Sequence, residues 1–499
     1  MSDTQRLRSA AAAALAQRFP ARWLEEHAVL PLELNGEAAR VAADGPVPPH
    51  VQDTLERVLQ ATVTWEPASA GDIRAAVLAA PRTATEGVGE LSTLSGDAVE
   101  SLDDLRALAS REPVVQVVNA ILAEAARTGT SDVHVESQAD GLRVRLRLDG
   151  VLRDMQQLGP EFRAAVVSRL KVLAGLDIAE RRLPQDGRAR IRLADRELDV
   201  RVSTLPALLG ESVVLRLLDG GGTAGPDSLD RLHLAAPVLS ALRPLLARSS
   251  GLLLVTGPTG SGKTTTLYAA LRERSVPGVK VVTVEDPVEY RLDGVVQLPV
   301  NTRAGFDFAA ALRAILRHDP DVLLVGEMRD ADTAEIAVRA ALTGHLVLST
   351  LHTTDAVSAL ARLRDMGVAP YLIAATLQGV LAQRLVRRVC DGCGQWRAPS
   401  EEERALMGGA SLPAQLREGH GCSACAGTGF HGRQAITELL VLDEAVREAF
   451  TRGDSISQLR SVARAHGVRS LRDDGLRLVA AGVTTVQELA RVLSAGDEG

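Results

Sequence analysis

The chain has 499 residues, which is too long for a single hydrophobic core and predicts two to four domains. Hydrophobic residues make up 46% and charged residues 24%, as in ordinary globular proteins, and the net charge of −7 argues against a nucleic-acid partner. The longest apolar runs, such as Leu252–Val255, are far shorter than the ~20 residues that span a bilayer. No secretory leader develops after the alanine run at 10–14. We therefore expect a cytosolic protein without a transmembrane segment, at most peripherally bound to a membrane.

Residues 1–80 are expected to form a small independent domain. Its pattern favours helices at Leu7–Phe19 and Val51–Leu59 and a short strand at Ala38–Ala42. Residues 81–110, rich in Thr, Gly, Ser and Glu, are expected to be a linker.

Residues 111–219 are expected to form an α+β domain around an antiparallel sheet. An amphipathic helix is predicted at Val114–Ala126, and apolar residues alternate with arginines over Leu142–Leu148, ahead of a hairpin turn at Asp149-Gly150. The alternation recurs at Ile191–Leu193 and Leu198–Val202. Residues 220–239, which begin GGGTAGP, are expected to be a flexible hinge.

Residues 240–389 alternate short apolar strands with helical stretches, which predicts a parallel sheet covered by helices. The expected strands are Leu252–Thr256, Lys280–Val284, Val322–Gly326 and Leu346–Thr350. Residues 390–433 hold the cysteines. Residues 434–499 are expected to be helical, with a capping box at Thr485 and Glu488.

The first of these strands runs into GPTGSGKTT, which satisfies the phosphate-loop pattern G-x-x-x-x-G-K-[ST]. Glycines let backbone N–H groups point at phosphate oxygens, and the following helix adds its positive end. Lys263 can reach the β- and γ-phosphates of ATP, while the Thr264 hydroxyl can hold Mg²⁺. The predicted nucleotide-binding residues here are Gly257, Pro258, Thr259, Gly260, Ser261, Gly262, Lys263, Thr264 and Thr265. The chain is therefore predicted to be an ATPase.

Acids follow the next two strands, and histidines bracket the fourth. Glu285 and Glu289 lie in VEDPVEY, and Glu327 follows the strand Val322–Gly326. Parallel strands would bring these acids to the edge that holds the phosphate loop, where one can orient water and another can hold Mg²⁺. The alternative for each is a solvated or capping acid. His345 and His352 are each as readily structural as phosphate-contacting, and their placement suggests that only one faces the phosphates at a time.

All four cysteines lie in two C-x-x-C pairs: Cys390 with Cys393, and Cys422 with Cys425. Four thiolates form the tetrahedral set that Zn²⁺ prefers, and a closed site of this kind indicates a structural metal. The insert at 394–421 is longer than in a usual zinc ribbon and must loop out. A redox pair is the alternative, but neither pair lies in a thioredoxin-like context.

Four motifs in this order resemble the ATPases of type II secretion and type IV pilus machines: GPTGSGKTT, VEDPVEY, LRHDPDVLLVGEMRD and TGHLVLSTLHTTDA. The resemblance extends through SDVHVE and RRLPQDGR and covers roughly residues 111–499. It implies a RecA-like P-loop domain preceded by a PAS-like α+β domain. The cysteine module resembles that of type II secretion (E-component) and pilus-extension ATPases, which retraction ATPases lack.

The resemblance also implies residue roles. Glu327 would be the catalytic glutamate of an atypical Walker B motif, Glu285 a second acid near Mg²⁺, and His345 and His352 the histidine box. Arg201 and Arg216 of the middle domain would join the nucleotide upon domain closure. Arg313, Arg317 and Arg329 would add to them. For each arginine the alternative is a solvated face, which is also the expectation for Arg143, Arg145 and Arg147.

The leading function is therefore Mg²⁺-dependent ATP hydrolysis by a homo-hexamer. Its domain motion would raise a pseudopilus and export protein through a type II secretion system, with the N-terminal domain docked on an inner-membrane platform component. Pilus extension is the nearest alternative. A second class is a nucleotide-binding scaffold with negligible hydrolysis, whose N-terminal domain docks a membrane protein or binds a cyclic dinucleotide. A nucleic-acid motor is disfavoured by net charge and the lack of a stacking platform.

Overall fold

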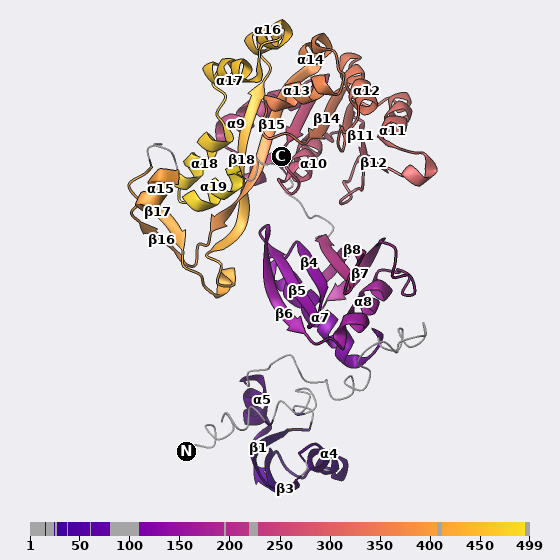
Figure 1. The fold of residues 1–499 in the computed structure, drawn as a ribbon, viewed down its shortest axis with the longest axis vertical. Helices are drawn as coiled ribbons and strands as arrows, with labels where there is room; N and C mark the ends of the chain where they lie inside the picture. Colours follow the sequence, from indigo (N-terminus) through magenta and orange to yellow (C-terminus); the bar gives the residue numbers. More distant parts are fainter. Residues whose placement is uncertain are drawn as a thin grey trace.

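The computed structural model describes residues 15, 24, 27–36, 38–59, 61–79, 109–193, 196–218, 228–406 and 412–494. The predicted tether GGGTAGP, most of the predicted linker at 81–110, and the predicted helix Leu7–Phe19 except Leu15 lie outside the described residues. The described elements form an N-terminal unit, a middle domain and a catalytic domain, coloured indigo, purple, and pink to yellow in Figure 1.

The N-terminal unit is a three-stranded sheet with helices packed on it, ordered β1-β2-β3. Strand β1 pairs antiparallel with β2, and β2 pairs parallel with β3. The predicted strand and the second predicted helix are confirmed. The elements are β1 Val29–Asn35, β2 Ala38–Ala43, α4 Pro49–Leu59, β3 Thr62–Pro67 and α5 Ala70–Ala79.

The middle domain is a six-stranded antiparallel sheet, ordered β6-β5-β4-β9-β8-β7, with two helices on one face. Val144 and Leu146 are buried against the helices, and the arginines between them are only partly buried. The predicted turn is confirmed, because Asp149 and Gly150 both have positive φ, 47° and 85°. The elements are α7 Glu112–Thr128, β4 Asp132–Gln138, β5 Gly141–Leu148, β6 Val151–Leu158, α8 Phe162–Leu173, β7 Gln185–Leu193, β8 Arg196–Ala207 and β9 Gly210–Leu218.

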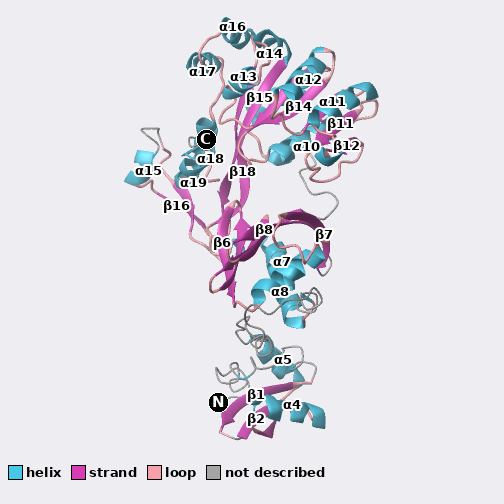
Figure 2. Ribbon diagram, turned by 45° about the vertical axis from the view of Figure 1, so that its right-hand side comes forward, coloured by secondary structure: helices cyan, strands magenta, loops and turns pink. Residues whose placement is uncertain are grey.

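The catalytic domain is built on a seven-stranded sheet, ordered β12-β11-β13-β14-β10-β15-β18, with helices on both faces (Figure 2). All pairs are parallel except β15 with β18. The four predicted strands are β10 Gly251–Thr256, β11 Val281–Glu285, β13 Val322–Val325 and β14 Leu346–Leu351. The other elements are α9 Ala236–Leu246, α10 Lys263–Arg274, β12 Val295–Pro299, α11 Phe308–Ile315, α12 Ala331–Leu342, α13 Ser358–Asp365, α14 Pro370–Thr376, β15 Leu377–Val389 and β18 Phe430–Val441.

Strand β18 overturns the prediction that the chain is helical from residue 434. Ile436 and Leu440 are completely buried, and the strand that holds them pairs with β15 over most of its length. Beyond β18 the helices follow as expected. The remaining elements are β16 Gly394–Arg397, α15 Glu401–Leu406, β17 Leu416–Gly419, α16 Glu444–Arg452, α17 Ile456–Ala465, α18 Leu471–Ala480 and α19 Val486–Ser494. No helix in the described part of the chain is long and apolar enough to cross a membrane.

Candidate active site

The phosphate loop leaves the carboxyl end of β10, a strand whose six residues are all buried. The loop turns back on itself through glycines: Gly257, Gly260 and Gly262 have φ values of 144°, 79° and 86°. Helix α10 then begins at Lys263. A buried strand, a glycine turn and a helix N-terminus therefore follow one another as the sequence predicts, and they form an anion cradle.

The Lys263 ammonium group lies over this loop. It donates to the carbonyl oxygens of Gly257 (2.7 Å) and Pro258 (2.9 Å). Burial lowers the pKa of Lys263 to about 8, although the charge of Glu327 opposes the shift. The Ser261 hydroxyl is buried and has no hydrogen-bond partner among the described residues. A charged amine and an unpaired donor in a glycine cradle fit the phosphates of a nucleotide.

Glu327 follows β13 and lies close to Lys263. The backbone beside it is fixed by β14, because the Thr350 hydroxyl donates to the Gly326 carbonyl oxygen at 2.7 Å. Its carboxylate is largely buried, pairs with the Arg329 guanidinium at 2.6 Å and lies 3.8 Å from the His352 Nε2 atom. One oxygen of this carboxylate is therefore paired with Arg329 and the other lies near His352, while the charges of Glu327 and Lys263 influence each other.

The two histidines lie at opposite edges of the sheet, and the structure corrects the prediction for His345. His352 follows β14 and lies beside Glu327; burial, then the charges of Lys263 and Arg329, lower its pKa. His345 precedes β14, and its carbonyl oxygen accepts from Gly251 at the start of β10. The residue therefore lies at the amino edge of the sheet, a whole strand away from the phosphate loop of its own chain.

The acid that contacts Thr264 is Glu289, not Glu285. The Thr264 hydroxyl donates to the Glu289 carboxylate at 3.3 Å. Burial raises the pKa of Glu289, while the hydrogen bond from Thr264 and the charge of Arg216 oppose that shift. The sequence interpretation gave Glu289 less weight than Glu285.

The Glu285 carboxylate is buried in a separate hydrogen-bond network. It accepts from the Tyr268 hydroxyl, from the Thr283 hydroxyl at 2.5 Å and from the Gln297 amide at 3.2 Å. Thr283 and Glu285 share one face of β11 because side chains alternate along a strand. Glu285 thus contacts helix α10 through Tyr268, and Glu289, not Glu285, is the acid beside the Thr264 hydroxyl that is predicted to hold Mg²⁺.

The middle domain contains two of the predicted site arginines, Arg201 and Arg216. Strand pairing places Arg216 of β9 between Arg201 of β8 and Asp132 of β4. Asp132 holds the Arg216 Nε atom at 2.8 Å, and the charge of Arg216 acts on Glu289 across the domain boundary. Arg201 pairs more loosely with Asp186, at 3.4 Å. Of the two predicted arginines, Arg216 is therefore the one whose charge acts on an acid of the site.

Two other predicted arginines do not lie there. Arg317 belongs to the short 3-10 helix Leu316–His318, immediately before β13, and its guanidinium donates to the carbonyl oxygen of Arg313 at 2.8 Å. Both side chains are exposed. Because they precede β13, they lie at the amino edge of the sheet, so the structure corrects their predicted place at the nucleotide of this chain.

The four cysteines form one cluster. Their Sγ atoms all lie within 4.8 Å of one another, and Cys390 and Cys393 lie 3.8 Å from Cys422 and Cys425 respectively. A tetrahedral site with Zn–S bonds of ~2.3 Å requires S···S distances of about 3.8 Å. Backbone N–H groups of Gly421 and Gly429 point at the Cys393 and Cys425 sulfurs, as suits thiolates. The cluster is compatible with a metal ion.

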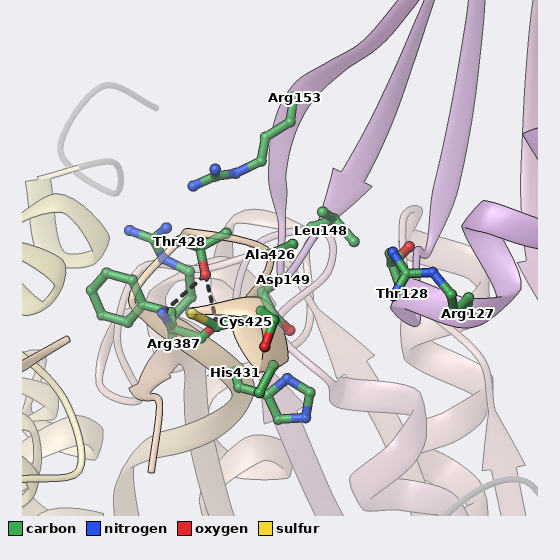
Figure 3. A pocket seen from close by; sticks show the side chains of 13 residues that line it. Arg127, Thr128, Leu148, Asp149, Arg153, Arg387, Cys425, Ala426, Thr428 and His431 are labelled. Carbon is green, nitrogen blue, oxygen red and sulfur yellow. Dashed lines mark hydrogen bonds between the residues drawn. The ribbon is translucent and has the colours of Figure 1, made fainter. Parts of the chain in front are cut away.

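A small pocket separates the cysteine module from the middle domain (Figure 3). Arg153 and Asp149 approach it from the β5–β6 hairpin, Arg387 from β15, and Thr428 and His431 from the module. Asp149 accepts from the Gly432 N–H at 3.0 Å and lies 3.7 Å from the Arg433 Nε atom. The middle domain thus contacts the catalytic domain beside the cysteines, and the charge of Arg216 acts on Glu289 at a second place.

Comparison with known proteins gives a consistent family. The model for Type II/IV secretion system protein matches residues 107–491, and that for the MshEN domain matches residues 6–86. Type II secretion system protein HxcR of Pseudomonas aeruginosa is 49% identical, over 82% of this chain and 83% of its own. Type II secretion system ATPase E of Vibrio cholerae is 47% identical, over 79% and 77%.

A solved structure has the same fold. The Legionella pneumophila ATPase DotB matches with a TM-score of 0.58 and 22% identity, over 76% of this chain and 96% of its own. This likeness confirms the predicted RecA-like architecture of the catalytic domain.

The depressed pKa of Lys263 predicts that ATP binding takes up a proton in mildly alkaline solution. At about pH 9 most Lys263 side chains of the free protein are neutral, and phosphates nearby favour the charged form. ATP binding should therefore take up nearly one proton at about pH 9, and affinity should fall as pH rises from about 8 towards 10. Calorimetry in buffers of different ionisation enthalpy measures the uptake. The variant Lys280→Met, which removes an exposed lysine, should retain it; binding without proton uptake at this pH would contradict the assignment.

Proposed function

We propose a motor function from one premise: the chain belongs to the Type II/IV secretion system protein family. It is an ATPase. The finer proposal is that it powers pseudopilus assembly and protein export in a type II secretion system. The relatives at 44–49% identity, all named as type II secretion proteins, support this assignment over pilus extension.

The observation that carries the proposal is the position of Glu327 beside Lys263, with Arg329 and His352 on its two oxygens. Lys263, Ser261 and the loop N–H groups would bind the β- and γ-phosphates, and Thr264 with Glu289 would hold Mg²⁺. When bound, Mg²⁺ neutralises charge on the transferring phosphate. Glu327 would orient a water and accept its proton, and Arg329 would neutralise charge on the phosphate oxygens.

Arg216 suggests how hydrolysis drives motion. It belongs to the middle domain, whereas every other group at this edge belongs to the catalytic domain. Triphosphate would draw Arg216 inward and loss of the γ-phosphate would release it, so the two domains would move as rigid bodies. Arg201 would join upon closure. We propose that six copies form a ring that transmits this motion.

Three further features belong to the proposal. The four cysteines would bind a structural Zn²⁺ that folds residues 390–433. The N-terminal domain would dock on an inner-membrane platform component. The protein would accordingly be cytoplasmic and peripherally recruited to the inner membrane.

Substitution Glu327→Gln tests the catalytic assignment. The amide cannot accept the proton from water, so kcat should fall by roughly 10²–10⁴-fold, while Kd for MgATP should change by less than about threefold. Phosphate release and nucleotide binding are measured together. Glu335→Gln, which alters an exposed ion pair with Arg339 on α12, is the matched control and should leave both unchanged. Hydrolysis by Glu327→Gln at the wild-type rate would refute the role.

Capture from membranes tests the choice of machine. Tagged full-length protein is incubated with detergent-solubilised inner membranes of the source organism, beside a chain that lacks residues 1–80. We expect a type II secretion platform component to bind only the full-length chain. Capture of a pilus platform component would instead assign the protein to pilus extension.

Metal analysis tests the cysteine site. Purified protein should carry about one zinc per chain, and Cys422→Ser should lose it because three thiolates leave the site open. Elemental analysis gives the stoichiometry, and thermal unfolding should show a destabilised module. The control Ser423→Ala, next to the same ligand, should keep its metal. Wild-type protein that is purified and refolded with zinc present yet binds none would refute the site.

A further inference from the structure

We propose that Gln383 is a positioning residue for ATP binding: its buried amide fixes the phosphate loop and the first turn of α10 on strand β15. The inference goes beyond the motor proposal and concerns the binding of ATP to this chain. The side chain is 3% exposed and lies directly after Ala382, which pairs with Thr256 at the end of β10.

Both ends of this amide are used by the loop. The Gln383 Nε2 atom donates to the Ser261 carbonyl oxygen at 2.7 Å. Its Oε1 atom accepts from the Thr266 hydroxyl, also at 2.7 Å. Residues 261 and 266 bracket Gly262, Lys263 and Thr264, which hold the phosphate and Mg²⁺ ligands, so one side chain spans the binding segment.

The phosphate loop packs so closely against Gln383 that side chains at two of its glycines would clash with this residue. A Cβ atom at Gly257 would lie 2.3 Å from the backbone carbonyl oxygen of Gln383. A Cβ atom at Gly262 would lie 2.7 Å from the side-chain Nε2 atom of Gln383. Two glycines of the phosphate-loop motif are therefore required by contact with Gln383 as well as by their positive φ angles. Strand β15 therefore supports the phosphate loop through direct contacts of Gln383.

This arrangement predicts an effect on binding more than on chemistry. Gln383 contacts neither Glu327 nor the groups around it in any described interaction, so the hydrolytic step should persist. Without the amide, the Ser261 carbonyl and the Thr266 hydroxyl, both in buried residues, would lose their partners and the loop would leave its binding geometry. The affinity for ATP is the quantity that should change.

The experiment is a double-mutant cycle on Gln383 and Thr266 in the full-length protein. Gln383→Leu should raise KM and Kd for ATP about tenfold, with kcat within about threefold of wild type. Thr266→Val should raise them less, because it removes one of the two bonds. The KM and Kd of the double variant should exceed those of Gln383→Leu by no more than about twofold, since the two residues share one interaction.

Two controls separate positioning from loss of folding. Thr266→Ser keeps the hydroxyl and should restore wild-type KM, and Gln395→Leu, at an exposed position on β16, should change nothing. Thermal unfolding of each variant is measured without nucleotide. If Gln383→Leu does not fold, the test is the comparison of KM for ATP between Thr266→Val, which should be raised, and Thr266→Ser, which should not. Unchanged KM in folded variants, or fully additive effects, would overturn the proposal.

Discussion

The whole site depends on parallel strands that end at the same edge. Thr256 of β10 lies beside Leu351 of β14, and Val325 of β13 lies beside Ser349. The residues that follow these strands therefore meet, which brings Lys263, Glu327 and His352 together from distant parts of the sequence. The same register carries the residues that precede the strands to the other edge. His345 and Arg317 are chemically suited to a phosphate site, but they lie about one strand length away from it, at the opposite edge of the sheet.

Electrostatics then explains why this edge suits a polyanion. One largely buried carboxylate, Glu327, lies among Lys263, Arg329 and His352, and Arg216 adds a further positive charge from another domain. Burial disfavours the charged form of Lys263 because its ammonium group loses hydration in the free site. Bound phosphates would offset this loss by attracting the positive charge. On the opposite side, Glu289 beside Thr264 gives the site its second acid, which suits a divalent cation held between nucleotide and protein.

The parts of this fold that were predictable from sequence are those with a local signature. The phosphate loop, its flanking strand and the paired cysteines each need only a few neighbouring residues, and all were located correctly. β18 was missed because Thr437 and Glu438 interrupt the apolar residues around Ile436, and because residues on both faces of the strand are buried, so that no alternation of apolar and polar residues marks it. The sequence could not show that Glu289, rather than Glu285, contacts Thr264. The orientation of the Glu285 side chain is set by hydrogen bonds from Tyr268 and Gln297, which belong to other elements. Gln383 carries no motif of its own, since its role exists only through its contacts.

Strand β15 is the structural link between the nucleotide and the cysteine module. Gln383 holds the phosphate loop; the next residue, Arg384, donates to the carbonyl oxygen of Val492 at the end of α19. Three residues after Arg384, Arg387 pairs with the fully buried Glu488 carboxylate at 2.7 Å, and the strand ends beside Cys390. The middle domain meets this line at two places: its Arg216 acts through its charge on Glu289 at the nucleotide edge, and its Asp149 accepts a hydrogen bond from Gly432 beside the cysteine module. If the middle domain moves as a rigid body, as proposed above, both interactions would change together, and the cysteine module would then belong to the interface that moves.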